Sequence, residues 1–162
     1  MKQQYSFGFE VFDDINELNK EDNALLQEAR KITQKAYAPY SNFLVGAAAM
    51  CNNGEMVFGT NQENASYPVG ICAERVLLAS ASMLQTEEPI KTIAISYNNL
   101  SGNGGSDRPI SPCGMCRQSL AEYEERTKQP IRIILSGMEG KVMVIESASQ
   151  LLPFSFGSGD MN

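Results

Sequence analysis

Three of the four cysteines lie in two short clusters. Cys72 opens the sequence Cys-Ala-Glu, and Cys113 and Cys116 belong to the sequence Pro-Cys-Gly-Met-Cys. Each cluster stands at the predicted start of a helix, where free backbone N–H groups and the helix dipole stabilise thiolates. Two helix starts that point to one spot would gather three thiolates, which suit a tetrahedral zinc ion with one open position. That position could take a water molecule whose pKa zinc lowers to about 7.

A carboxylate lies two residues after the first cysteine, at Glu74. The chain contains no histidine, which excludes Ser-His-Asp and Cys-His nucleophilic devices. Acid–base chemistry at neutral pH must therefore use a carboxylate, Lys, Tyr or Cys, and Glu74 is the natural general base. Because residues two apart do not share a helix face, Cys72 and Glu74 can meet only if the metal lies off the helix end.

The cysteines alone leave two other interpretations open. A Cys-x-x-Cys pair in a cytosolic protein could be a redox pair or half of a structural zinc site, with Cys51 as a fourth ligand. Cys51 follows an apolar strand, so we interpret it as a buried free thiol. Taken alone, Glu74 is typical of a solvated helix residue.

The elements that must position these residues alternate between helices and strands. The spacing of apolar residues predicts helices over residues 20–36, from near Cys72 and from near Cys113. Apolar runs and turn signals predict strands over residues 43–50, 56–59, 92–95, 131–135 and 142–145. The alternation of Tyr5, Phe7, Phe9 and Val11 with polar residues predicts a further short strand. This order indicates an α/β sandwich with helices covering a mixed sheet.

Length and composition limit the function classes. A chain of 162 residues predicts one domain over residues 1–162. The net charge of −6 argues against nucleic acid or an anionic membrane as a partner. The chain has no run of 18 apolar residues, and residues 1–5 show no apolar run of signal-peptide type, so we expect a cytoplasmic protein without a membrane span.

Several blocks of sequence resemble the cytidine deaminase superfamily. Cys72-Ala73-Glu74 followed by Pro112-Cys113-x-x-Cys116 resembles the zinc signature of this superfamily, in its three-cysteine variant. The other blocks resemble the free-nucleoside cytidine deaminases and follow in the expected order: residues 36–48, 61–68, 111–118 and 151–157. The resemblance implies a three-layer α/β/α sandwich around a five-stranded mixed sheet.

The resemblance also implies a role for each matching residue. Zinc, one ion per subunit, would be held by Cys72, Cys113 and Cys116, and Glu74 would move the protons. Arg75 would hydrogen-bond the thiolates and offset the net charge of −1 that three thiolates leave on zinc. The implied substrate contacts are Phe43 against the cytosine ring, Asn61 and Glu63 on the ribose 3′-hydroxyl, and backbone groups of Ala73, Ser111 and Pro112 on the pyrimidine edge.

The implied function is zinc-dependent hydrolysis of cytidine and 2′-deoxycytidine to uridine and 2′-deoxyuridine in pyrimidine salvage. The resemblance is to the short three-cysteine members of the family and implies a homotetramer. In such an assembly a C-terminal Phe reaches a neighbouring subunit's site, and here that residue is Phe156. The alternatives are a deaminase of another aminopyrimidine, a polynucleotide-editing deaminase and a non-catalytic zinc module. The ribose block at residues 61–68 argues against the first alternative, and the net charge of −6 argues against the second. Glu74 argues against the third, because a structural zinc site has no use for a carboxylate beside an open position.

Two segments depart from the family pattern. Residues 1–19 extend beyond the usual start and could add an edge strand. The loop at residues 98–110 is long and rich in glycine, and it leads directly into Ser111.

Overall fold

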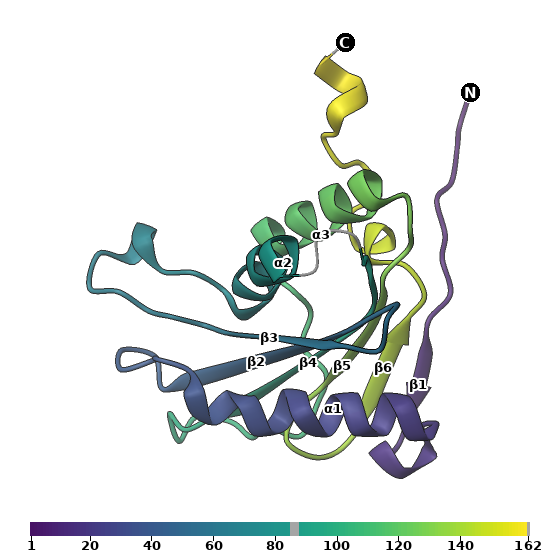
Figure 1. Ribbon diagram of the computed structural model, residues 1–162. Helices are drawn as coiled ribbons and strands as arrows, with labels where there is room; N and C mark the ends of the chain where they lie inside the picture. The colour runs from purple at the N-terminus through teal and green to yellow at the C-terminus, as the bar shows by residue number, and fades with distance from the viewer. Residues whose placement is uncertain (85–87, 162) are drawn as a thin grey trace.

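The computed structural model describes residues 1–84 and 88–161, and within them six strands form one mixed sheet in the order β1-β6-β5-β4-β2-β3 (Figure 1). The strands are β1 (Glu10–Phe12), β2 (Phe43–Cys51), β3 (Met56–Thr60), β4 (Ile90–Asn99), β5 (Arg132–Ser136) and β6 (Val142–Ile145). β4 and β5 run parallel, and the other neighbours pair antiparallel. The helices are α1 (Lys20–Ile32), α2 (Ala73–Leu84) and α3 (Gly114–Thr127).

Helices cover both faces of this sheet. α1 packs on one face, and α2 and α3 lie side by side on the other (Figure 1). The predicted three-layer α/β/α sandwich is confirmed, but the sheet has six strands rather than the five that the resemblance implies. The sixth strand is β1, which pairs with β6 at the edge of the sheet. None of the described helices combines the length and apolar character needed to cross a membrane.

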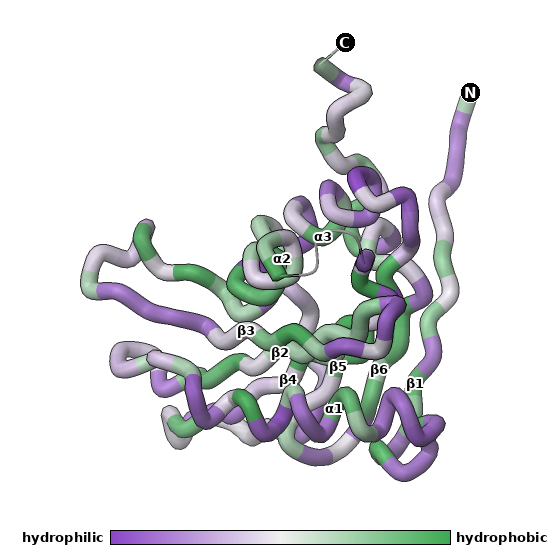
Figure 2. The backbone as a smooth tube through the Cα atoms, viewed as in Figure 1, coloured by the Kyte–Doolittle hydropathy of each residue, from purple (hydrophilic) through white to green (hydrophobic). Residues whose placement is uncertain are grey.

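The alternation of side chains along the strands divides the core into two parts. In β2, Ala47 and Ala49 face α2 and α3, whereas Ala48 faces α1. Figure 2 shows hydrophobic residues along the central strands and a mixture of polar and hydrophobic residues along α1. The central strands are therefore buried on both faces, which explains why β2 reads as a continuous apolar run rather than as an alternating pattern.

Local signals in the sequence account for the ends of α1. The Asn19 side chain accepts a hydrogen bond from the backbone N–H of Asp22 at 3.0 Å and so caps the helix. Leu25, Leu26 and Ala29 form its buried stripe. The α-helix ends at Ile32 and continues as a 3-10 turn, so it is shorter than the predicted range of residues 20–36.

The N-terminal strand is shorter than the alternation of apolar residues predicts. Pairing begins at Glu10, which lies opposite Val144, although the alternation starts at Tyr5. Because β6 ends at Ile145, the residues before Phe9 have no strand of this sheet beside them. Residues 1–9 continue away from the sheet as an extended segment (Figure 1).

Candidate active site and metal centre

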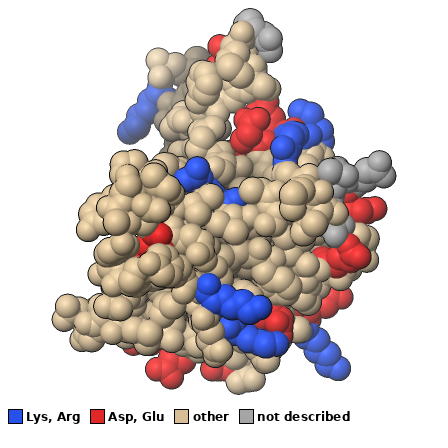
Figure 3. Space-filling view, turned by 60° about the vertical axis from the view of Figure 1, so that its left-hand side comes forward, with Lys and Arg blue, Asp and Glu red and all other residues tan. Residues whose placement is uncertain are grey.

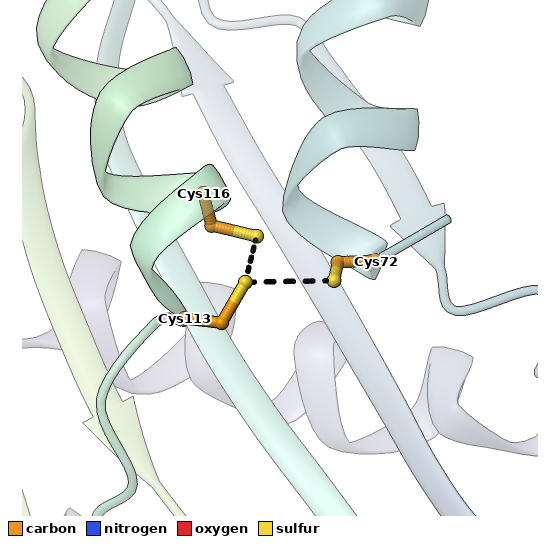
Figure 4. Close-up of side chains that lie close together, drawn as sticks. All are labelled: Cys72, Cys113 and Cys116. Carbon is orange, nitrogen blue, oxygen red and sulfur yellow. Dashed lines mark hydrogen bonds between the residues drawn. The ribbon is translucent and has the colours of Figure 1, made fainter. Parts of the chain in front are cut away.

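Three cysteine sulfurs meet where α2 and α3 begin. Cys72 directly precedes α2, Cys113 is the N-cap residue of α3, and Cys116 lies in the first turn of α3. The Cys113 Sγ atom lies 3.8 Å from the Sγ of Cys72 and 3.5 Å from that of Cys116, and all three atoms lie within 4.8 Å of one another (Figure 4). The two clusters, which lie far apart in the sequence, therefore form one group.

This spacing of sulfurs fits a zinc ion. Zn–S bonds of about 2.3 Å at tetrahedral angles place two sulfurs about 3.8 Å apart, close to the distances seen here. Cys51 lies elsewhere, buried in the core cluster that contains Ala81 and Tyr123. The group found among the described residues thus supplies three thiol donors, and a tetrahedral ion would keep a fourth position for another ligand.

The sulfurs influence one another's ionisation. A hydrogen bond with the Cys116 thiol lowers the pKa of Cys72 to about 6. The same hydrogen bond raises the pKa of Cys116, because the Cys116 thiol is the donor and loss of its proton would break the bond. The lowered pKa of Cys72 favours its thiolate form, and binding of a cation would displace the protons of the remaining thiols.

A cavity of about 210 Å³ opens beside the cysteines. This volume is below the roughly 300–1,000 Å³ of pockets that take drug-sized ligands, so it suits a single small ring. Its wall combines apolar side chains with the cysteine clusters and consists of Val45, Asn61, Cys72, Ala73, Glu74, Ile95, Ile110, Ser111, Pro112 and Cys113.

Glu74 is the titratable carboxylate in this wall. It lies in the first turn of α2 and is only 5% exposed. Burial raises the pKa of its carboxyl group, because the charged form loses hydration. A raised pKa makes the carboxyl group easier to protonate, which suits a general acid–base that must both accept and return a proton. Cys72 reaches the same cavity from outside the helix, which resolves the geometric objection to its close spacing with Glu74.

A close contact between β3 and α2 positions this end of the helix. Gly59 in β3 packs against the backbone of α2, where a Cβ atom would lie 2.3 Å from the Ala73 carbonyl oxygen and 2.5 Å from the Leu77 nitrogen. Only glycine permits this approach. Ala73 is fully buried, and its position between Cys72 and Glu74 makes the contact part of the framework of the site.

The Asn61 side chain joins two parts of the cavity wall. Its Oδ1 atom accepts a hydrogen bond from the Val45 backbone N–H at 2.7 Å, and its Nδ2 atom donates to the Phe43 carbonyl oxygen at 2.8 Å. The predicted ribose ligand thus lines the cavity and also holds the start of β2 in place.

Phe43 lies outside the lining of the cavity, although the resemblance implies a contact with cytosine. Its ring stacks on that of Tyr97 in β4, with centroids 4.9 Å apart and planes 12° from parallel. Phe43 precedes Val45 by two residues, and Tyr97 follows Ile95 by two, so this aromatic pair continues the sheet face that forms the apolar cavity wall.

Glu63 lines a second hollow of about 370 Å³, together with Tyr40, Ser41, Asn64, Tyr67 and Gly70. Its carboxylate accepts hydrogen bonds from the backbone N–H groups of Tyr40 at 2.9 Å and Ser41 at 3.3 Å. Partial desolvation opposes its ionisation, but the hydrogen bonds from Ser41 and Tyr40 outweigh that effect and lower the pKa of Glu63. The two predicted ribose ligands, Asn61 and Glu63, therefore line different hollows of one chain.

Arg75 faces a groove between α2 and α3 rather than the cavity. Among the residues that the structure describes, no hydrogen bond joins its guanidinium group to a cysteine sulfur. Its positive charge still adds a smaller contribution to the lowered pKa of Cys72, behind the hydrogen bond of Cys116. The charge of Arg75 thus influences Cys72, and a direct hydrogen bond from Arg75 to the sulfurs stays a prediction.

Ser111 and Pro112 both line the cavity, and an arginine that the sequence analysis missed fixes their position. Arg117 Nε donates to the Pro112 carbonyl oxygen at 2.8 Å, and Nη1 donates to the Leu151 carbonyl oxygen at 3.2 Å. Its place directly after Cys116 was the available signal. The sequence motifs gave no role to the cavity-lining side chains Val45, Ile95 and Ile110 or to the stacked Tyr97. Strand alternation through the apolar runs at residues 43–50 and 92–97 could have identified Val45, Ile95 and Tyr97.

The C-terminal tail leaves the body of the chain beyond α3 (Figure 1). Phe156 lies in this tail with 62% of its surface exposed, and its carbonyl oxygen accepts a hydrogen bond from Gln118 Nε2 at 2.7 Å. Phe156 is not part of the lining of its own chain's cavity.

The long loop before Ser111 is anchored at its base rather than free. The Ser106 hydroxyl accepts a hydrogen bond from the Asn99 backbone N–H at 2.8 Å, and the Ser106 carbonyl oxygen accepts one from Glu139 at 3.2 Å. Gly137 permits a close approach, because a Cβ atom there would lie 2.0 Å from the Ser106 carbonyl oxygen. The loop is thus tied to the turn between β5 and β6.

Charges on the visible face are sparse. Figure 3 turns the side that bears residues 61–70 toward the viewer, and most of that face is uncharged. Lys and Arg form small separate groups there and no continuous basic stripe (Figure 3). This face therefore lacks the electrostatic pattern that draws in a polynucleotide.

Comparisons with known proteins give one consistent result. Residues 19–129 match the family model for the cytidine and deoxycytidylate deaminase zinc-binding region. The chain is 36% identical over 138 residues to a cytidine deaminase of Halalkalibacterium halodurans, which covers 85% of this chain and 96% of the relative. The fold is similar to the crystal structure of cytidine deaminase from Burkholderia pseudomallei, with a TM-score of 0.70, 40% identity, and coverage of 86% of this chain and 100% of that one. It is also similar to the crystal structure of the Mycobacterium tuberculosis enzyme, with a TM-score of 0.63, 29% identity, and coverage of 86% and 99%.

Proposed function

The chain belongs to the cytidine and deoxycytidylate deaminase family, and from this premise we propose that it hydrolyses cytidine and 2′-deoxycytidine. The reaction consumes one water molecule and yields uridine or 2′-deoxyuridine and ammonia. One observation carries the proposal: a cluster of three cysteine sulfurs adjoins a cavity of about 210 Å³, and Cys72, Cys113 and the buried Glu74 line that cavity.

We propose that Cys72, Cys113 and Cys116 hold one zinc ion in each subunit. The sulfur distances of 3.5 and 3.8 Å support this assignment. When bound, zinc supplies Lewis-acid chemistry that lowers the pKa of water. Three thiolates exceed the charge of the ion by one unit, and the guanidinium group of Arg75 offsets part of that excess.

Glu74 carries the protons of the reaction in this proposal. Its carboxylate accepts a proton from the attacking water and delivers it to N3 of cytosine, while the water oxygen bonds to C4. A second transfer through the same carboxylate protonates the amino group, which leaves as ammonia. The raised pKa of Glu74 supports this dual role, because the group must be protonated and deprotonated within one turnover.

Recognition of the base is assigned to the cavity wall. Backbone groups of Ala73, Ser111 and Pro112 would pair with the pyrimidine edge, because all three residues line the cavity. Val45 and Ile95 supply apolar surface for the ring. We expect a purine, with its second ring, to be excluded by the cavity volume of about 210 Å³.

We assign the ribose 3′-hydroxyl to Asn61 and Glu63. The lowered pKa of Glu63 supports a role as a charged acceptor. A 3′-phosphodiester offers no donor to that carboxylate and adds a negative charge beside it, so both effects oppose binding of an oligonucleotide. The proposed substrates are therefore free nucleosides.

Two proposed features need neighbouring subunits. We propose that the chain forms a homotetramer and that Phe156 of one subunit contributes to the site of another. The exposed position of Phe156 on a tail that leaves the body of the chain supports this assignment. We also propose that Phe43, whose ring stacks on Tyr97, lies against the cytosine ring. A single domain, a cytoplasmic location and a role in pyrimidine salvage remain predictions of the sequence analysis.

The loss of absorbance that accompanies conversion of cytidine to uridine tests the proposal directly. Purified protein is mixed with cytidine before and after treatment with a zinc chelator, and zinc is then added back. We expect turnover that the chelator abolishes and added zinc restores. Metal-replete protein without turnover would refute the proposed function.

A substrate series tests the assignment of Glu63. Cytidine, 2′-deoxycytidine, CMP and a short C-containing single strand are compared under one set of conditions. We expect turnover of the two free nucleosides and rejection of the single strand. Comparable turnover of the single strand would overturn the assignment of Glu63.

A further inference from the structure

The N-terminal segment, residues 1–11, presents a row of apolar side chains to solvent. Tyr5, Phe7, Phe9 and Val11 alternate with polar residues and are 50%, 39%, 53% and 50% exposed. The ring centroids of Tyr5 and Phe7 lie 6.2 Å apart and those of Phe7 and Phe9 6.4 Å apart, so the rings form one continuous surface. Contiguous exposed apolar surface on an acidic protein usually marks an interaction site.

The backbone of this segment is free to pair with another strand. β1 is the terminal strand of the sheet, so only one of its edges is covered, by β6. In the described chain, residues 1–8 are extended and take part in no backbone hydrogen bond. A free edge of this length is a template for addition of a strand.

The segment is self-complementary in one antiparallel register. If two copies pair about Ser6, Lys2 lies opposite the partner's Glu10 and Tyr5 lies opposite the partner's Phe7. The two-fold symmetry of such a pair creates each contact twice. Lys2 and Glu10 form no ion pair within the described part of the chain, so both charges are available to a partner.

Other registers lose this match. Pairing about Tyr5 places Lys2 opposite the partner's Gly8, and pairing about Phe7 places it opposite the partner's Phe12. A register that pairs odd with even positions would put the aromatic rows of the two copies on opposite faces of the ribbon. The register about Ser6 alone among these combines opposite charges on one face with all the rings on the other.

We infer that residues 1–11 are an interface between two copies of this chain, which pair as antiparallel strands about Ser6. The two copies would form a two-stranded ribbon that extends the sheet beyond β1. One face would carry Tyr5, Phe7 and Phe9 of both copies, and the other would carry the pairs between Lys2 and the partner's Glu10. This segment precedes the match to the family model, which begins at residue 19, so the interface belongs to the chain's own extension.

Engineered disulfides test the register. Full-length, zinc-loaded Ser6→Cys and Gln4→Cys variants are oxidised under mild conditions beside the unmodified chain, and cross-linked peptides are identified by mass spectrometry. In the inferred register the α-carbons of the two cysteines introduced at position 6 lie about 5 Å apart, within reach of a disulfide. The matched control at position 4 places its two cysteines about 13 Å apart along the strands, which is beyond that reach.

We expect a covalent dimer linked through position 6 and little or none through position 4. Equal cross-linking at both positions, or none at position 6, would refute the inferred register. Absence of a covalent dimer would also mean that the aromatic row serves a different partner.

Exchange of the charges tests the pairing without cysteines. Lys2→Glu and Glu10→Lys each place like charges opposite one another twice per dimer, whereas the double variant restores opposite charges. We expect each single variant to weaken pairing roughly tenfold and the double variant to recover it, as measured by sedimentation over a range of concentrations. A double variant no better than the single ones would overturn the inference.

Turnover of cytidine keeps this test separate from the proposed function. Neither Lys2 nor Glu10 lines the cavity of about 210 Å³. We therefore expect unchanged kcat in all three charge variants, because the inferred N-terminal pairing is additional to the tetramer proposed above. Failure of the interface would thus leave the assigned chemistry intact.

Discussion

Replacement of Gly59 by alanine tests the framework of the active site without changing any proposed catalytic group. The added Cβ would lie 2.3 Å from the Ala73 carbonyl oxygen and 2.5 Å from the Leu77 nitrogen, and ordinary contact begins at 3.4 Å. Both are backbone atoms, so no flexible side chain can relieve the clash. The start of α2 must retreat by about 1 Å and carry Cys72 and Glu74 with it.

This displacement predicts two separate losses. Overpacking of this kind lowers the free energy of unfolding by about 1–3 kcal/mol. A shift of about 1 Å in catalytic geometry costs about 10²-fold in rate. We expect Gly59→Ala to show both effects, measured by urea unfolding and by kcat/KM for cytidine at a temperature at which the variant stays folded. Zinc content is determined in parallel.

Gly46→Ala is the matched control. A Cβ at Gly46 would lie 2.3 Å from the Ala29 carbonyl oxygen in α1, on the opposite face of the sheet. The shortest contact is equal in distance and is again to a backbone carbonyl oxygen, but it displaces a helix that carries no proposed site residue. We expect a similar loss of stability and less than about tenfold loss of kcat/KM. Equal loss of activity in both variants, or full activity in Gly59→Ala, would refute the reasoning.

Four further outcomes are expected. Glu74→Gln should retain zinc and the fold, while turnover falls by at least about 10²–10⁴-fold; loss of zinc would mean that the carboxylate is misassigned. Cys113→Ala should abolish zinc binding and Cys51→Ala should not, as measured by metal analysis, and a requirement for Cys51 would indicate a closed structural site. Arg117→Ala removes two hydrogen bonds to backbone carbonyls and should lower the free energy of unfolding by about 2 kcal/mol in urea; an unchanged midpoint would contradict its positioning role. Phe156→Ala should raise KM for cytidine in a protein that sediments as a tetramer, and a monomer with full activity would contradict the shared site.

The sequence alone determined the features that depend on neighbours along the chain. Helix and strand periodicity and the capping of α1 by Asn19 are local, and the predicted elements agree with the structure to within a few residues. The position of each cysteine cluster at the start of a helix could also be predicted from the sequence, because it depends only on the residues of that one helix. The length of β4 was underestimated, because the continuation of this strand through Tyr97 to Asn99 depends on its pairing with β2.

Only the tertiary structure decided which distant residues meet. Packing of α2 and α3 on one face of the sheet brings Cys72 to within 3.8 Å of Cys113, and no local rule predicts that distance. The register of β2 against β4 places the Phe43 ring on that of Tyr97, outside the lining of the cavity. It also ended the pairing of β1 at Glu10, because β6 is too short to accompany the rest of the segment. Contacts of this kind depend on where separate elements dock against one another. Side-chain packing sets that position, and the sequence pattern of a single segment does not contain it.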